Sequence, residues 1–179
     1  YNLNRLSNIV LVDKLNFSLK YIYALLNSEL LDYYFNNFFN EYEVKPLHLW
    51  QLPIKEIPLS EQQPFIERAN KMLSLNKQFH ELIDKFLHRI QDNLEIEKLT
   101  KKLDSFYDYD FKDFLDELKK QKISISLSDQ DNREPYFKEY KEKVLSLKGE
   151  IERTDKEIDE MVFDLYGLNK EERRVILGR

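Results

Sequence analysis

The chain has 179 residues, of which 42% are hydrophobic and 34% charged, with a formal net charge of −5. This length and balance indicate one soluble folded domain, or a small domain with a helical extension. The absence of Cys excludes disulfides and thiolate metal sites, and it fits the reducing cytoplasm in which we expect the protein. No apolar run approaches the ~20 residues of a membrane span. Because the chain begins at Tyr1 and not at Met, we expect a fragment of a larger protein.

Residues 1–59 predict a mixed α/β part. The run Ile9–Val12 is rich in β-branched residues and predicts a buried strand. Ser18 is a predicted cap for a helix that runs from Leu19 to Phe38, where apolar residues recur at spacings of three and four. A loop follows, and the segment Trp50–Ile57 predicts one or two short strands. The sequence therefore begins with strands and a helix in alternation.

Two long helices are predicted behind this part. Ser60 is the expected cap of the first, because Gln63 follows it at the spacing of a capping box. Apolar residues alternate at steps of three and four over residues 61–93 and again over 134–166. This periodicity is typical of a coiled-coil seam. We predict that the two arms pair as a long antiparallel helical hairpin.

The polar positions of the two seams suggest a register for the hairpin. Each seam contains one polar residue, Asn76 in the first and Thr154 in the second. A register that opposes them also pairs Ile90 with Tyr140. A shift by one heptad would bury each polar group against an apolar partner, which costs roughly 1–3 kcal/mol for an unsatisfied group.

Residues 94–133 form a predicted insert between the arms. Its expected elements are two helices, a weak strand and a polar loop, at residues 94–103, 110–120, 123–127 and 128–133. Gly167 is a predicted helix stop, and a short helix should cover residues 169–177. The expected fold class is mainly α with a small α/β part, divided into residues 1–59 and 60–179.

Three phrases in the sequence resemble one protein family. They are LLNSEL at Leu25–Leu30, LPI and IPLSEQQPFI between Leu52 and Ile66, and TDKEIDEMVFDLYGL at Thr154–Leu168. In this order they resemble the C-terminal specificity region of type IIG restriction-modification enzymes and related adenine-specific DNA methyltransferases. The resemblance spans about residues 25–168. Phe163 stands where Tyr is usual in that family, and the insert is longer than many relatives carry.

The resemblance implies that residues 1–59 are the C-terminal portion of a DNA target recognition domain and that the helical region follows it. The fragment would recognise a DNA sequence without catalysis of its own. Its partners would be double-stranded DNA and the N-terminal methyltransferase portion of the parent chain. That parent would be an N6-adenine DNA methyltransferase that uses S-adenosylmethionine, with Mg²⁺ if an endonuclease is fused. The Asn-Pro-Pro-Tyr motif and the Gly-rich cofactor loop are absent from this sequence, so we expect no cofactor in the fragment.

Candidate DNA-binding residues lie in the predicted loops and strands before Pro58. Arg, Lys and Asn can hold phosphates or base edges, while Tyr and Trp can stack or wedge. The candidates are Asn4, Arg5, Lys14, Tyr42, Lys45, His48 and Trp50. The alternative interpretation makes Trp50 a core anchor and the other candidates solvated loop residues.

Other sites have weaker support in the sequence. The stretch Glu117–Lys119 imitates part of a nuclease site, but its neighbours follow a helical period and place it on a solvated flank. The three histidines lack the spacing of a zinc site. We therefore expect no catalytic residue and no metal ligand. The rival function is a coiled-coil module for protein interaction or for a homo-oligomer through the helices.

Overall fold

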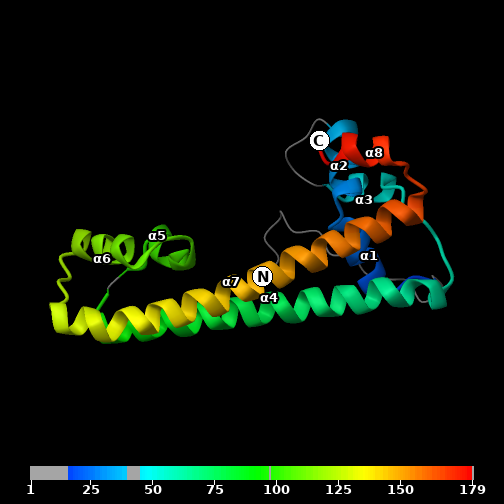
Figure 1. Ribbon diagram of the computed structural model, residues 1–179. Helices are drawn as coiled ribbons and strands as arrows, with labels where there is room; N and C mark the ends of the chain where they lie inside the picture. The colour runs from blue at the N-terminus through cyan, green and yellow to red at the C-terminus, as the bar shows by residue number, and fades with distance from the viewer. Residues whose placement is uncertain (1–15, 40–44, 97, 179) are drawn as a thin grey trace. The chain divides into compact units, whose positions relative to one another are not determined.

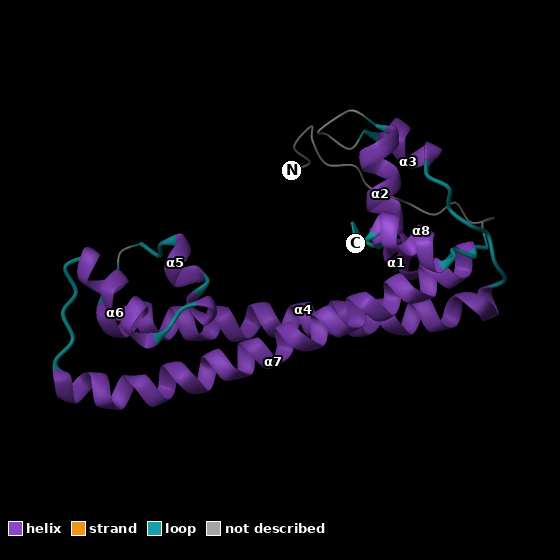
Figure 2. Ribbon diagram, turned by 45° about the horizontal axis from the view of Figure 1, so that its top comes forward, coloured by secondary structure: helices purple, strands orange, loops and turns teal. Residues whose placement is uncertain are grey.

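The computed structural model of the chain describes residues 16–39, 45–96 and 98–178. All regular structure in these ranges is helical, so the mainly helical fold class is confirmed (Figures 1 and 2). The helices are α1 (Leu19–Leu26), α2 (Glu29–Phe38), α3 (Pro46–Gln51), α4 (Leu59–Leu94), α5 (Lys101–Asp104), a 3₁₀ turn (Phe106–Asp108), α6 (Phe111–Lys120), α7 (Leu127–Tyr166) and α8 (Lys170–Ile176). No helix among them is long and apolar enough to cross a membrane.

The predicted strands are wrong wherever the structure describes their residues. The segment from Trp50 to Ile57 begins in α3 and continues without regular structure, and residues 123–126 are also irregular. Pro53 lies within the first of these segments and Pro58 directly follows it, and neither residue has the backbone N–H donor that a strand ladder needs. The predicted strand Ile9–Val12 lies outside the described residues. No α/β part is therefore present in the described ranges.

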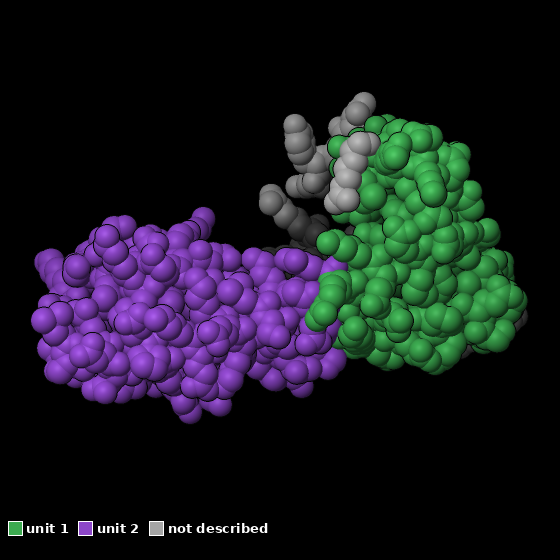
Figure 3. Space-filling model, viewed as in Figure 1, with its two compact units in different colours: residues 1–72, 153–179 green, residues 73–152 purple. Residues whose placement is uncertain are grey.

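The chain forms two compact units (Figure 3). Unit 1 consists of residues 1–72 and 153–179, and unit 2 of residues 73–152. Both α4 and α7 contribute residues to each unit. This division does not coincide with the predicted boundary between residues 59 and 60. The assignment of residues 1–59 to a DNA-reading domain and of residues 60–179 to a helical region stays a prediction.

The predicted pairing of the two arms is confirmed, since α4 packs against α7. Within unit 2 the Phe86 ring lies 5.5 Å from that of Tyr140, and the Arg89 guanidinium donates to the Tyr136 hydroxyl at 3.4 Å. Phe86 contacts Tyr140, and the later α4 residue Arg89 contacts the earlier α7 residue Tyr136. The two helices therefore run antiparallel. Within unit 1, Arg68 pairs with Glu157 at 2.6 Å.

The predicted register, which opposes Asn76 to Thr154, stays a prediction. Continued along both seams, it opposes Phe86 to Val144, and both residues belong to the same buried cluster. The α7 rings beside Phe86 are those of Tyr136, Phe137 and Tyr140. Two rings from the insert, Phe106 and Phe114, also pack on Phe86.

An aromatic core holds unit 2 together. Phe86 is 1% exposed and stacks on Phe106 at 3.9 Å, with Phe114 and Phe137 beside it. The other buried members of the cluster are Ile83, Leu87, Ile90, Ile96, Leu103, Phe111, Leu118, Tyr140 and Val144. Helix α6 turns its apolar face toward this core, so the predicted helix over residues 110–120 is confirmed. The other predicted helix, 94–103, is reduced to the single turn of α5.

Local capping explains where two helices begin. Ser28 ends the predicted single helix, because its hydroxyl donates to Leu25 and accepts from the Leu31 N–H, which starts α2. Ser126 caps α7, because its hydroxyl accepts the Asp129 N–H at 3.2 Å. Residues 128–133, predicted as a polar loop, are therefore part of this helix. Ser60 is not a cap, since α4 already begins at Leu59.

Gly167 ends α7 as the sequence predicts. Its φ of 71° lies in the left-handed region that glycine enters without steric cost. The Gly167 N–H donates to the Asp164 carbonyl and the Leu168 N–H to the Phe163 carbonyl, both at 3.0 Å. This pair of bonds is a Schellman ending. The short helix predicted after it is α8, capped by Asn169.

Candidate nucleic-acid interface

The candidate interface lies on unit 1, whose N-terminal helices are held to α4 by Gln62. This side chain is fully buried. Its amide oxygen accepts the Ser18 N–H at 2.8 Å, and its amide nitrogen donates to the carbonyls of Asn16 and Ile57 at 2.6 and 2.9 Å. One glutamine therefore satisfies three backbone groups from two separate segments. The entry of α1 is fixed to the start of α4 by these bonds.

Two tyrosines tie the segment before α4 to its surroundings. The Tyr21 hydroxyl donates to the Lys55 carbonyl at 2.7 Å, and the Lys55 N–H donates to the Tyr166 hydroxyl at 3.1 Å. Tyr166 in turn donates to the Pro53 carbonyl. Burial raises the pKa of both phenols, so both stay protonated and act as donors at neutral pH. The irregular segment 52–58 is thus held by hydrogen bonds in place of a sheet.

Asp159 joins α2 to α7. Its carboxylate accepts the Glu29 N–H at 2.9 Å, at the first residue of α2, where the helix dipole favours a negative charge. Asp159 is only 7% exposed. Burial raises the pKa of this carboxyl to about 6, although the bond from Glu29 opposes the shift. The nearby Asp155 carboxylate adds to the rise.

These bonds bring together the three phrases on which the family resemblance depends. Glu29 belongs to the first phrase, Pro53 and Lys55 fall within the second, and Asp159 and Tyr166 belong to the third. The phrases are therefore the parts of one structural joint. Their side chains are used to hold α1 and α2 on α4 and α7, and their role in this structure is positioning.

Helix α3 is attached to the end of α2 through His48. The imidazole is 6% exposed, stacks on Phe39 with ring centroids 4.5 Å apart, and meets the edge of Phe35 at 5.6 Å. Its Nδ1 accepts the Lys45 N–H at 3.2 Å. Pro46 occupies the first turn of α3, where its missing N–H is not needed. His48 thus orients α3, which carries the exposed residues of the site.

The outer face of α3 is apolar and exposed. Trp50 is 87% exposed and Leu47 is 63% exposed, and their spacing of three places them on the same side of the helix. Phe38, at the end of α2, is 67% exposed. Leaving these apolar side chains in water, and not burying them, costs roughly 25 cal/mol per Å² of apolar surface. Such residues are typical of a surface that binds a partner.

The predicted site residues divide into two groups. Asn4, Arg5, Lys14 and Tyr42 lie outside the described residues. Lys45, His48 and Trp50 are brought together by α3 and its cap. Trp50 is exposed, so the alternative that makes it a core anchor is wrong. His48 is buried, which gives it an orienting role in this arrangement.

Leu47 and Phe38 were missed in the sequence. Phe38 matched the apolar period of the predicted helix from Leu19 and was assigned to its buried face. The break at Ser28 rotates the second half of that segment into a separate helix. The signal that could have revealed this is the serine itself, since its side chain competes with helix continuation.

Glu117 and Lys119 lie on α6, as the helical period predicts, but only Lys119 is on a solvated flank, because Glu117 is buried. Glu117 accepts from Thr100 at 2.9 Å and from Lys120 at 2.9 Å, and these two bonds lower the pKa of its carboxyl. Lys119 pairs with Asp116. The described part of the chain contains no group of three His, Asp or Glu side chains that could hold a metal ion.

The comparisons with known proteins found one family. The family described as "Domain of unknown function (DUF8810)" matches residues 58–162, which is more than half of the chain. The match begins just before α4 and ends within the last turns of α7, so it contains the hairpin and its insert but leaves out α1 to α3. Neither a curated protein nor a solved structure matches the chain.

Proposed function

The chain belongs to the DUF8810 family, a domain of unknown function, and we propose that it is the sequence-specific DNA-recognition module of a restriction-modification enzyme. In this proposal residues 1–59 are the C-terminal portion of a target recognition domain. The family match then covers a coiled-coil hairpin with its insert at 94–133. The module is non-catalytic and cytoplasmic. Its parent chain is an N6-adenine DNA methyltransferase that supplies S-adenosylmethionine and, where a nuclease is fused, Mg²⁺.

The exposed face of α3 is the observation that carries the proposal. Trp50 presents its indole ring to solvent, and Lys45 supplies a cation at the N-cap of α3. A ring of this kind can stack on a base or wedge between base steps, while a lysine holds a phosphate. The three phrases support the same interpretation, because the joint that they form attaches α3 to the long helices.

The chain's negative charge sets a condition on this mode of binding. Phosphate contacts must come from a few local cations and not from a wide basic surface. We therefore expect a modest dependence of affinity on salt and a clear contribution from the aromatic ring. Replacement of Lys45 by Ala should lower the slope of log K against log salt by about 1.

The test is retention of a randomised DNA duplex pool by the 179-residue chain across a salt series, with sequencing of the retained fraction. Enrichment of one short motif, lost in Trp50→Ala, would support DNA reading through α3. Val175→Ala, which truncates another exposed apolar residue of unit 1, and Lys156→Ala, which removes an exposed cation elsewhere, are the matched controls. Retention that is the same in Trp50→Ala and wild type would exclude α3 as the reading element.

A second candidate function is protein interaction through the helices. Leu73 on α4 and Leu145 on α7 are 46% and 39% exposed in unit 2, although both are large apolar residues. A second protomer or another subunit could cover them. Sedimentation across a range of concentrations should then show an oligomer that the Leu73→Ser, Leu145→Ser double variant dissociates. A monomer at every concentration would exclude self-association and leave only a different partner.

A further inference from the structure

A cavity of about 300 Å³ opens in unit 2, beside the aromatic core. The last turns of α4, the first turns of α7 and one residue of α6 surround it. Its lining consists of Phe86, Arg89, Ile90, Asn93, Leu94, Phe114, Asn132, Arg133, Tyr136 and Phe137. Concave sites that bind small molecules begin at about this size and combine an apolar lining with a few polar groups.

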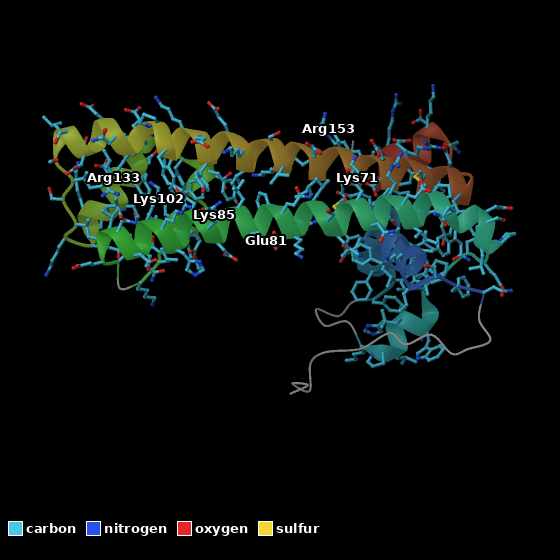
Figure 4. All side chains as sticks on the ribbon, turned by 90° about the horizontal axis from the view of Figure 1, so that it is seen from below. Lys71, Glu81, Lys85, Lys102, Arg133 and Arg153 are labelled. Carbon is cyan, nitrogen blue, oxygen red and sulfur yellow. The ribbon has the colours of Figure 1, made fainter. Side chains whose placement is uncertain are left out.

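The polar part of the lining is positively charged. It contains two arginines, two asparagines and a tyrosine, and no carboxylate, in a chain whose net charge is −5. Within the described part of the chain, the Arg89 guanidinium donates only to the Tyr136 hydroxyl at 3.4 Å, and this bond raises the pKa of Arg89. No described carboxylate pairs with Arg133, whose side chain is labelled on α7 in Figure 4. Both guanidinium groups therefore keep donors available for an anion.

The spacing along the two helices explains why these groups converge. Arg89 and Asn93 are four residues apart on α4, and Arg133 and Phe137 are four apart on α7, so each pair shares one helix face. Arg133 is helical because Ser126 caps α7 upstream of it. A polar loop over residues 128–133, as the sequence suggests, would not hold the Arg133 side chain in a fixed direction.

The apolar part of the lining is aromatic. Phe86, Phe114 and Phe137 lie within 6.1 Å of one another by ring centroids, and Tyr136 stacks beside Phe86 at 5.8 Å. Aromatic rings of this kind favour offset or edge contacts with another ring. A guanidinium group matches a carboxylate or a phosphate through two parallel hydrogen bonds.

We propose that this cavity, defined as the Arg89–Arg133 pocket, binds a small organic anion with a flat aromatic body. The ring of the ligand lies against the aromatic lining beside Tyr136, and its carboxylate or phosphate accepts from the two arginines. The pocket lies wholly within unit 2, so this site is separate from α3 and does not depend on DNA recognition.

The test is isothermal titration of the intact chain with 2-naphthoate and phenyl phosphate. Neutral 2-naphthylmethanol and inorganic phosphate serve as probes of the two halves of the ligand. Both aromatic anions should bind saturably, with a dissociation constant of about 1 mM or lower. The neutral alcohol and the bare phosphate should each bind at least about tenfold more weakly, because each lacks one half of the recognised chemistry.

Two variants locate the site. Arg133→Gln and Arg89→Gln should each weaken the binding of both anions by about tenfold without changing the melting temperature of the chain. Lys85→Gln is the matched control, because Lys85 is an exposed cation one turn before Arg89 and does not line the cavity (Figure 4). Trp50→Ala should also leave naphthoate binding unchanged, which separates this site from the DNA-binding proposal.

Four results would overturn the proposal. No saturable binding up to about 10 mM would exclude a site of useful affinity. Equal binding of the neutral alcohol would mean an apolar cleft without anion recognition. Inorganic phosphate that binds as tightly as phenyl phosphate would show that the aromatic ring does not contribute to recognition. Naphthoate affinity unchanged in both arginine variants would place the binding elsewhere on the chain.

Discussion

The two units are stabilised by different kinds of contact. In unit 1, hydrogen bonds join segments far apart in the sequence, as Gln62, Tyr21 and Asp159 show. In unit 2, aromatic rings from α4, α6, α7 and the 3₁₀ turn pack around Phe86. Hydrogen bonds are directional and specify one partner each, whereas apolar packing is nearly indifferent to partner identity at constant volume. Unit 1 can therefore be recognised in the sequence by short specific phrases, whereas unit 2 is recognisable only by the helical period of its apolar residues.

The largest effect should follow from truncating the centre of unit 2. Phe86→Ala removes a ring that is 1% exposed and leaves a cavity among its aromatic neighbours. The free energy of unfolding should fall by about 3–5 kcal/mol, measured by urea denaturation. Leu127→Ala, which truncates a side chain that is 80% exposed in the same unit, should change it by less than about 0.5 kcal/mol. A similar loss in both variants would contradict the aromatic core.

In unit 1, the strongest pH effect should come from Asp159. Its pKa is raised to about 6, so the folded chain holds this proton more tightly than the unfolded chain. The resulting stabilisation is complete below pH ~4 and is lost as the pH rises toward 6, amounting to about 3 kcal/mol at most.

Asp159→Asn tests this directly, since the amide oxygen can still accept the Glu29 N–H but cannot titrate. The variant should be the more stable protein at pH 7, and its advantage should shrink as the pH falls to 4. Thermal melts at several pH values measure the difference. Asp32→Asn, on the exposed side of α2, is the control and should show no such trend. An advantage that is independent of pH would contradict the titration of Asp159.

Two adjacent glutamines give a sharper comparison of buried and exposed polar groups. Gln62→Leu leaves the Ser18 N–H and two carbonyls without their partner, and it should destabilise the chain by about 1–3 kcal/mol. Gln63→Leu changes an exposed side chain that bonds only Glu67, and it should be nearly neutral. Denaturant midpoints of the two variants measure this. Equal effects would show that the phrase does not act through these bonds.

The smallest effects concern two glycines, and they should have opposite signs. Gly167→Ala places a side chain at a φ of 71° and should cost about 1 kcal/mol. Gly149→Ala, inside α7 with no atom within 4 Å of the added carbon, should stabilise the chain by about 0.5–1 kcal/mol. Melting temperatures of the two variants should therefore move in opposite directions. A fall in both would mean that Gly149 has a packing role.

Local signals were sufficient where the neighbouring residues decide the structure. Ser18 caps α1, and Gly167 ends α7, because a hydroxyl or a left-handed backbone acts within one turn. Ser60 failed as a cap because the Pro58 carbonyl already accepts the N–H groups of Glu61 and Gln62, so the helix begins before it. Ser126 and Asp129 contain the capping signal for the start of α7. The polar residues 128–133 suggested a loop in its place.

The sequence by itself determined the two long arms, the end of α7 at Gly167 and the helical class, because a period of three and four is a property of one helix. Only the tertiary structure decided the exposure of Trp50 and the placement of Arg89 and Arg133 around one cavity. It also showed that the three phrases form one joint. These features depend on contacts between residues distant in the chain, and the distance between two helices cannot be predicted from a sequence pattern. The physical reason is that packing, unlike capping, is chosen by the partner surface.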